Sequence, residues 1–196
     1  IDGVISGSSK NLTKTGNGNL LLRGNNTYTG STTISAGTLT LSGSGNLGAG
    51  SYAGAIANSG TFKFDTSANL ISTGVISGSG VVNVSGAGIF EPTATNTYTG
   101  GTIIDGGKIA AKTDRNFGAN PSSDDPDNVL LRNTGTIYFG SVNSSNSLGH
   151  VNFGYNNNRG IYLESGQHNF IDGSGGNGRN KIYSVISGVG GVTYGK

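Results

Sequence analysis

The residue types that most often carry out chemistry are few in this sequence, and their densest group is acidic. Asp124, Asp125 and Asp127 lie close together beside Pro121 and Pro126. Calcium ions in proteins are held by several oxygen ligands, so a carboxylate cluster is one way to begin such a site. Acidic side chains are mostly exposed in folded proteins, however, and these three share one proline-bounded loop. We therefore interpret them as a solvated loop.

Two glutamates raise the question of glycoside hydrolysis, which requires a pair of carboxyl groups flanking the scissile bond. Glu91 and Glu164 are far apart in the sequence, and no motif supports their pairing. We interpret both as solvated side chains.

The remaining candidates for metal binding lack the spacing that such sites need. His150 and His168 are isolated. The stretch from Gly175 to Tyr183 resembles one calcium-binding nonapeptide turn, but no second copy follows it. We interpret it as an ordinary glycine-rich turn. The sequence therefore predicts no catalytic residue, no cofactor and no metal site.

Aromatic residues placed among Asn and Gly are the more promising functional group. They concentrate in one part of the chain, at Tyr138, Phe139, Phe153, Tyr155, Tyr162 and Phe170. Tyr is favoured in contact surfaces for proteins and other ligands. The alternative is that some of these rings fill the core of longer coils. The contact-surface hypothesis assigns the site to Tyr138, Tyr155, Tyr162, Asn156, Asn157 and Arg159.

Composition excludes several function classes. The chain has 196 residues, of which 37 are Gly and only 3 are Pro, and charged residues make up 11%. The net charge is +2 and Lys and Arg are not clustered, so we expect no nucleic-acid partner. Cys is absent, which leaves no disulfides. No apolar run approaches about 18 residues, so we expect no membrane insertion of this segment.

A repeated pentapeptide organises the chain. Asn26–Gly30 and Asn96–Gly100 have the same sequence, Asn-Thr-Tyr-Thr-Gly, and the flanking motifs recur at the same offset. Strands of about 4–6 residues between frequent turns, without helical periodicity, predict an all-β chain, and the long repeat favours stacked coils over a sandwich. One coil of a β-helix takes roughly 20–25 residues, so one repeat unit predicts three coils and the whole chain eight or nine. Both pentapeptides should then lie on the same side of the rod, with Asn26 and Asn96 bonded to corner backbone.

The chain is expected to be a single β-helix segment over residues 1–196. Its first repeat unit covers residues 3–73 and its second covers 74–140, with extra residues in the loop from Asn120 to Asp127. Irregular, embellished coils follow over 141–183. A third unit begins over 184–196, where Val185-Ile186-Ser187-Gly188 repeats the opening of the earlier units.

These repeats resemble the autotransporter-associated β-strand repeat of bacterial passenger domains, which are secreted through an outer-membrane barrel. The similarity is close over Leu12–Leu41, partial over Gly74–Ala111 and weak over Ser141–Tyr183. The resemblance implies a right-handed parallel β-helix, or solenoid, at the surface of a Gram-negative bacterium or outside the cell. It also implies a translocator barrel in the same chain as partner. Because the repeat is scaffold, it implies no catalytic residues.

We therefore expect a non-catalytic segment of a secreted or surface-displayed autotransporter passenger, acting as a rigid stalk with a role in adhesion. One alternative is an adhesin face on residues 141–183 that binds a protein or glycan of a host or neighbouring cell. The other is a β-helical polysaccharide lyase or hydrolase.

Overall fold

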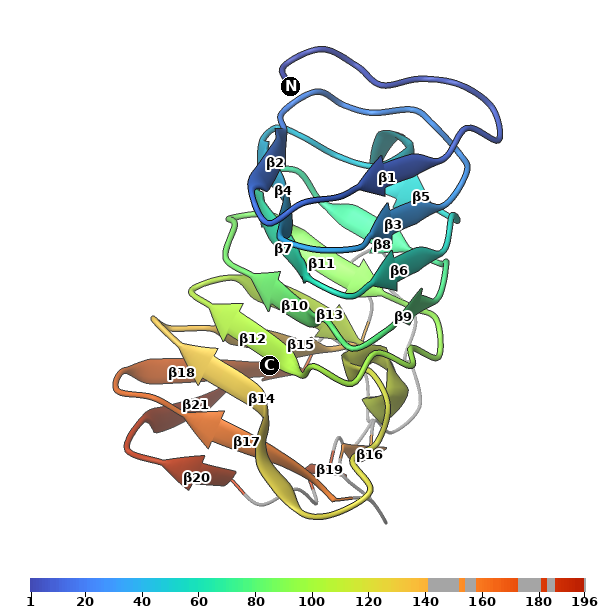
Figure 1. Cartoon of the computed structure of the whole chain (residues 1–196). Coiled ribbons are helices and arrows are strands. Elements are labelled where there is room, and N and C mark those ends of the chain that lie inside the picture. The colour runs from blue at the N-terminus through green and yellow to red at the C-terminus, as the bar shows by residue number, and fades with distance from the viewer. Residues whose placement is uncertain (141–151, 154–157, 173–180, 183–185, 196) are drawn as a thin grey trace.

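The computed structural model describes residues 1–140, 152–153, 158–172, 181–182 and 186–195. The chain winds into a solenoid whose turns stack from the N-terminal to the C-terminal end (Figure 1). Its strand pairs are parallel, as the sequence predicts. Each strand lies beside the strand one turn earlier and the strand one turn later. No α-helix occurs in the described residues; the two short helical segments are 3-10 helices, η1 (Gly48–Gly50) and η2 (Asp114–Phe117).

The strands form three long sheets and one short pair. The four-stranded sheet has the order β1 (Leu12–Lys14), β3 (Thr32–Ile34), β6 (Ile56–Asn58) and β9 (Ile76–Ser77). The eight-stranded sheet has the order β2 (Asn19–Leu22), β4 (Thr38–Gly43), β7 (Thr61–Thr66), β10 (Val81–Val84), β12 (Thr102–Asp105), β14 (Asp125–Arg132), β17 (Arg159–Leu163) and β20 (Ile186–Gly188).

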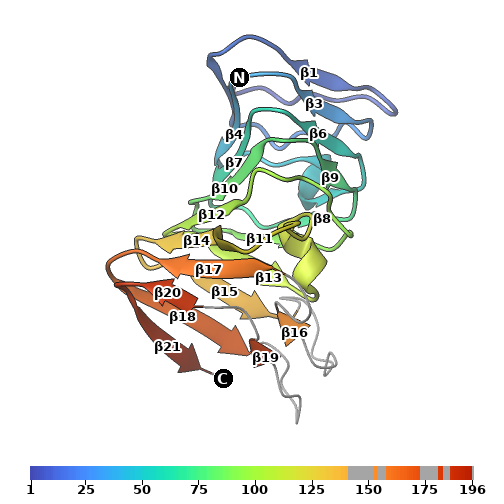
Figure 2. The same ribbon diagram turned by 60° about the horizontal axis from the view of Figure 1, so that its bottom comes forward.

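The seven-stranded sheet begins at β5 (Ser51–Tyr52) and continues through β8 (Leu70–Ser72), β11 (Ile89–Pro92), β13 (Lys108–Ala111), β15 (Thr136–Phe139), β18 (Gln167–Asp172) and β21 (Gly191–Gly195). The short pair is β16 (Asn152–Phe153) with β19 (Lys181–Ile182). Seen toward the C-terminal end, β14, β17 and β20 lie side by side, as do β15, β18 and β21 (Figure 2). These sheets amount to about seven turns, so the expected eight or nine coils are not confirmed.

A continuous apolar core fills the centre of the solenoid. Strand β7 shows how it forms, because Phe62 and Phe64 are buried while the residues between and beside them are partly exposed. The ring of Phe90, from the seven-stranded sheet, stacks on Phe64 at 5.4 Å between ring centroids and meets Phe62 edge-on at 5.9 Å. The side chains of neighbouring sheets therefore interdigitate between the walls of the solenoid.

The two pentapeptides do not lie on the same side of the rod, so that expectation is wrong. Thr32 follows the first copy and lies in β3 of the four-stranded sheet, whereas Thr102 follows the second and lies in β12 of the eight-stranded sheet. The reason is turn length. Thr32 pairs with Ile56 and Ile56 with Ile76, and the Ile76 amide bonds to Asn96 one turn later. The chain therefore reaches the wall that contains Thr32 again at Asn96, which is the first residue of the second pentapeptide. The rest of this pentapeptide forms the next corner, before the eight-stranded sheet.

The local structure of the pentapeptide is nevertheless the same at both corners. The Asn26 Oδ1 accepts a hydrogen bond from the Ile5 amide at 2.9 Å, and its Nδ2 donates to the carbonyls of Gly24 and Asn46 at 2.8 and 2.9 Å. Asn96 bonds the preceding and following turns in the same way, through the Ile76 amide at 2.8 Å and the Asn116 carbonyl at 2.9 Å. The expectation that these asparagines satisfy corner backbone is confirmed.

Each pentapeptide also contributes a buried tyrosine. The Tyr28 hydroxyl shares a 2.8 Å hydrogen bond with Thr32, and the Tyr98 hydroxyl shares a 2.7 Å bond with Thr102. Burial raises the pKa of Tyr98 to about 12. Because the folded state favours the neutral phenol, this group stabilises the fold below the ordinary tyrosine pKa, and that contribution is lost as the pH rises through about 12.

We predict that Asn26→Ala destabilises the chain by at least about 2 kcal/mol, because it leaves the Ile5 amide without its acceptor and removes one of the two donors of the Gly24 and Asn46 carbonyls. Asn25→Ala is the matched control, since Asn25 is exposed and adjacent in sequence; its effect should be within about 0.5 kcal/mol. Urea unfolding of both variants gives the comparison. Equal midpoints would show that the asparagine bonds do not stabilise the stack.

Candidate functional site

The most irregular described part of the solenoid is the connection from η2 to β14. Val82 pairs with Phe62 of the preceding turn and with Thr102 of the following turn, so both of these turns have the same length in residues. Thr102 then pairs with Val129, and Val129 with Ile161, so each of these later turns is longer. The register of β14 against β17 also shifts between Asp125 and Val129. The sequence predicts extra residues in this loop, and the longer turn from Thr102 to Val129 contains them.

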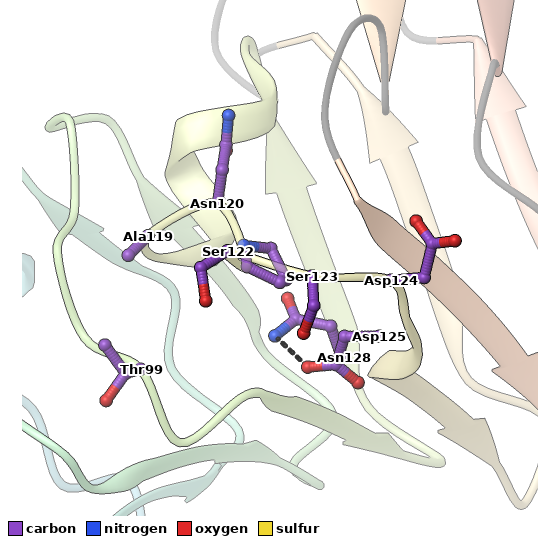
Figure 3. Close-up of a pocket in the computed structure, with 9 residues that line it drawn as sticks. Thr99, Ala119, Asn120, Ser122, Ser123, Asp124, Asp125 and Asn128 are labelled. Carbon is purple, nitrogen blue, oxygen red and sulfur yellow. Dashed lines mark hydrogen bonds between the residues drawn. The ribbon is translucent and has the colours of Figure 1, made fainter.

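A polar pocket of about 440 Å³ opens between this loop and the preceding corner (Figure 3). Its walls are formed by loop residues, by the start of β14 and by Thr99 of the second pentapeptide. The lining residues are Thr99, Ala119, Asn120, Pro121, Ser122, Ser123, Asp124, Asp125 and Asn128. Sequence reasoning singled out only the aspartates among them, because the hydroxyl and amide side chains carry no motif.

Helix η2 anchors the upstream end of the loop. Asn116 and Thr113 form a reciprocal capping box. The Asn116 Oδ1 also accepts from the Lys112 amide at 2.8 Å, and its Nδ2 donates to the Ala94 carbonyl at 3.0 Å. Phe117 is buried in the core. The chain is therefore fixed to the stack immediately before it leaves for the loop.

Arg159 fixes the downstream side from within the protein. Its side chain is only 1% exposed, and its guanidinium donates to the carbonyls of Phe117, Gly118 and Ala119 at 2.8, 3.0 and 2.8 Å. It also bonds the Asn128 Oδ1 and pairs with Asp114 at 3.3 Å. A guanidinium suits this position because its fork of donors can reach several acceptors at once. The expectation that Arg159 belongs to an exposed contact surface is wrong, because these bonds hold it inside.

The floor of the pocket is a chain of polar contacts. The Asn128 Nδ2 donates to Asp125 at 3.1 Å, and the Asp125 amide donates to the Asn158 carbonyl at 2.9 Å. A side-chain hydrogen bond with Asp125 raises the pKa of Asp127 above its ordinary value. The folded state thus binds this proton more tightly than the unfolded chain. The contact therefore stabilises the fold in acid and weakens as the pH rises through the raised pKa.

The other site residues predicted from the sequence are not brought together. Tyr138 and Tyr162 are half-buried, and they lie on different sheets, in β15 and β17. Tyr155, Asn156 and Asn157 lie outside the described residues, as do His150, most of the Gly175–Tyr183 stretch and the side chains of Phe153, His168 and Phe170. Among the residues that the structure describes, no group of three or more acidic, His or Cys side chains is placed to hold a metal ion.

The two glutamates are also separated. Glu91 lies in β11 of the seven-stranded sheet, whereas Glu164 follows β17 of the eight-stranded sheet. Glu91 is 2% exposed and pairs with Lys112 at 3.1 Å, so the expectation of a solvated side chain is wrong for this residue. The Lys112 ammonium, which is partly exposed, lies beside the buried Glu91 carboxylate. Its charge offsets the cost of removing the carboxylate from water.

Comparison with known families gives one match. Residues 12–41 and 77–111 match the family model of the passenger-associated-transport-repeat. This confirms the resemblance to an autotransporter passenger repeat, over nearly the same residues that the sequence indicates. No curated protein and no solved structure matches the chain. In the part of the chain that the structure describes, no helix is long and apolar enough to cross a membrane. Repeat and solenoid together fit a stalk segment of a passenger.

We predict that Arg159→Ala destabilises the chain by about 3–5 kcal/mol and speeds amide hydrogen exchange over residues 117–121, because several buried acceptors lose their donor. The control is Arg115→Ala, which removes an exposed arginine from η2 and should change stability by less than about 0.5 kcal/mol. Urea unfolding and exchange mass spectrometry measure the two effects. Unchanged exchange over 117–121 in Arg159→Ala would contradict the anchoring role.

Proposed function

We propose that this chain is a non-catalytic segment of a secreted or surface-displayed autotransporter passenger, where it acts as a rigid stalk. The observation that supports this proposal is the burial of the characteristic side chains of the repeat. Asn26, Tyr28 and Thr32 are buried, as are Asn96, Tyr98 and Thr102, and all of them bond neighbouring backbone or one another. The asparagine and the tyrosine of each pentapeptide, with the threonine that follows it, therefore serve to join turns, whereas the two threonines inside the pentapeptide are exposed.

The stalk proposal includes several features implied by the passenger repeat. They are a Gram-negative source, a location at the cell surface or outside the cell, and a translocator barrel in the same chain. It also includes right-handed winding, which is supported by the strong preference for right-handed crossovers between parallel strands of one sheet. A rod of parallel turns suits a spacer, because each turn adds about 4.8 Å of length and contacts only its neighbours.

A polysaccharide lyase or hydrolase on this scaffold has less support. Asp125 is bonded to Asn128 in the loop, and Glu91 is paired with Lys112 on another sheet. Asp124 and Asp125 line one pocket but are consecutive residues of one loop, whereas sugar hydrolysis requires two carboxyl groups that flank the scissile bond.

Adhesion is a second candidate role, favoured by an apolar row on the outside of the eight-stranded sheet. Ile103 pairs with Leu130, and Leu130 pairs with Tyr162. All three are half-buried, while the residues that follow them, Ile104, Leu131 and Leu163, are buried in the core. The row therefore faces outward. It would suit contact with a protein or glycan on a host or neighbouring cell, since Tyr is favoured in such interfaces.

The stalk proposal predicts that the segment is displayed when it is placed between an export signal and an outer-membrane translocator barrel. An N-terminal epitope tag should become accessible to antibody and to added protease on intact Gram-negative cells. A barrel fused to the tag without the segment provides the control for export. Retention of the tagged segment in the periplasm, with the control displayed, would count against a passenger role. Release of unsaturated sugars from pectin, lost on Asp125→Asn, would instead support the enzyme.

The adhesion candidate predicts that Tyr162→Ala lowers binding of displaying cells to host-cell monolayers at least about tenfold, because an aromatic residue at the centre of an interface commonly contributes about 2 kcal/mol or more. Tyr138→Ala is the matched control, since it removes a half-buried tyrosine from a different sheet. If both variants bind equally well at equal display, the outer face of the eight-stranded sheet is not the adhesion surface.

A further inference from the structure

The pocket beside the insertion loop carries an unused set of hydrogen-bonding groups. The side-chain hydroxyls of Thr99, Ser122 and Ser123 line it, and none of them bonds another described residue. Ser122 and Thr99 lie on opposite walls, with the open space between them (Figure 3). A hydroxyl can both donate and accept hydrogen bonds, so these groups can serve a ligand that does the same.

The charges around this space select against anions. Asp124 and Asp125 line the pocket, and its lining residues include no Lys, Arg or His. The guanidinium of Arg159, which bonds the lining residues Ala119 and Asn128, is also bonded to Phe117, Gly118 and Asp114. Carboxylates accept hydrogen bonds from hydroxyl groups but repel phosphates and other carboxylates. The pocket therefore disfavours anions and offers acceptors to a ligand that donates several hydrogen bonds.

Size and rigidity also suit a small ligand. A volume of about 440 Å³ falls within the range of roughly 300–1,000 Å³ that small-molecule sites occupy. The loop is held at one end by Asn116 and from below by Arg159 and Asn128. Because these bonds lie within the protein itself, the walls are held in place for a ligand.

We propose that this pocket binds one uncharged sugar residue, with its hydroxyls bonded to Ser122, Ser123, Thr99 and Asp125. A sugar ring offers donors and acceptors around its rim, which matches hydroxyls on facing walls and a carboxylate at the floor. The site is separate from the apolar row on the eight-stranded sheet, and it does not depend on the stalk role.

The test is saturation-transfer NMR and titration of the full chain with the methyl glycosides of glucose, galactose, mannose and N-acetylglucosamine. Galacturonic acid and sialic acid are the acidic comparison. We expect at least one neutral glycoside to bind, and the acidic sugars to bind at least about tenfold more weakly. The double variant Ser122→Ala/Ser123→Ala should weaken the neutral ligand about tenfold, as expected for the loss of two hydrogen bonds.

Ser59→Ala is the control, because Ser59 is an exposed serine at another corner of the solenoid; its binding should stay within about twofold of the parent. Equal unfolding midpoints for all variants exclude a folding defect. No transfer to any neutral glycoside overturns the proposal. So does equal binding by the double variant, or equal binding of acidic sugars. A response to calcium alone, reported by the amides of 124–128, would assign the loop to a cation and overturn it as well. Surface display is unaffected by any of these outcomes.

Discussion

Every turn of this solenoid must satisfy its corner backbone groups with atoms from the turns above and below. Strands satisfy their own groups through the parallel ladders, whereas at corners backbone bonds between turns satisfy only some of the groups, and unpaired backbone groups inside a protein are costly. A few side chains bond the corner groups that remain. Asn26 and Asn96 bond adjacent turns in the same way. Lys14 is 7% exposed, and its ammonium donates to the carbonyls of Thr15, Gly16 and Ala36 at 2.7, 2.6 and 3.2 Å.

Glycine meets the same constraint where turns approach too closely for a side chain. Gly37 has φ of 68°, and a Cβ added there would lie 2.4 Å from the Gly18 carbonyl oxygen. Contacts of this kind explain why the chain uses glycine at many of its corners. The corner chemistry is local, which is why one pentapeptide can be used before the four-stranded sheet in the first repeat and before the eight-stranded sheet in the second.

The departure from regular turns is where distinctive chemistry gathers. Once the loop after η2 leaves the stack, its backbone is no longer held by turns of equal length, and Arg159 supplies donors to carbonyls far back along the chain. A buried guanidinium is a demanding solution, because its charge must be matched by many acceptors. The same arrangement leaves the hydroxyls of Ser122 and Ser123 facing open space, so the anchor and the pocket have a common origin.

The sequence by itself determined the architecture and its scaffold chemistry. Short β-rich runs, a long internal repeat and the absence of helical periodicity predicted stacked parallel coils. Asn in the pentapeptide predicted corner hydrogen bonds, because the preference of Asn for turns is a local property of the sequence. Only the tertiary structure decided which corner each repeat occupies, since that depends on the summed lengths of all intervening turns. It also decided that Arg159 and Glu91 are buried and that Tyr138 and Tyr162 lie on separate sheets. Burial of a polar side chain is set by neighbours distant in sequence, and no local pattern encodes it.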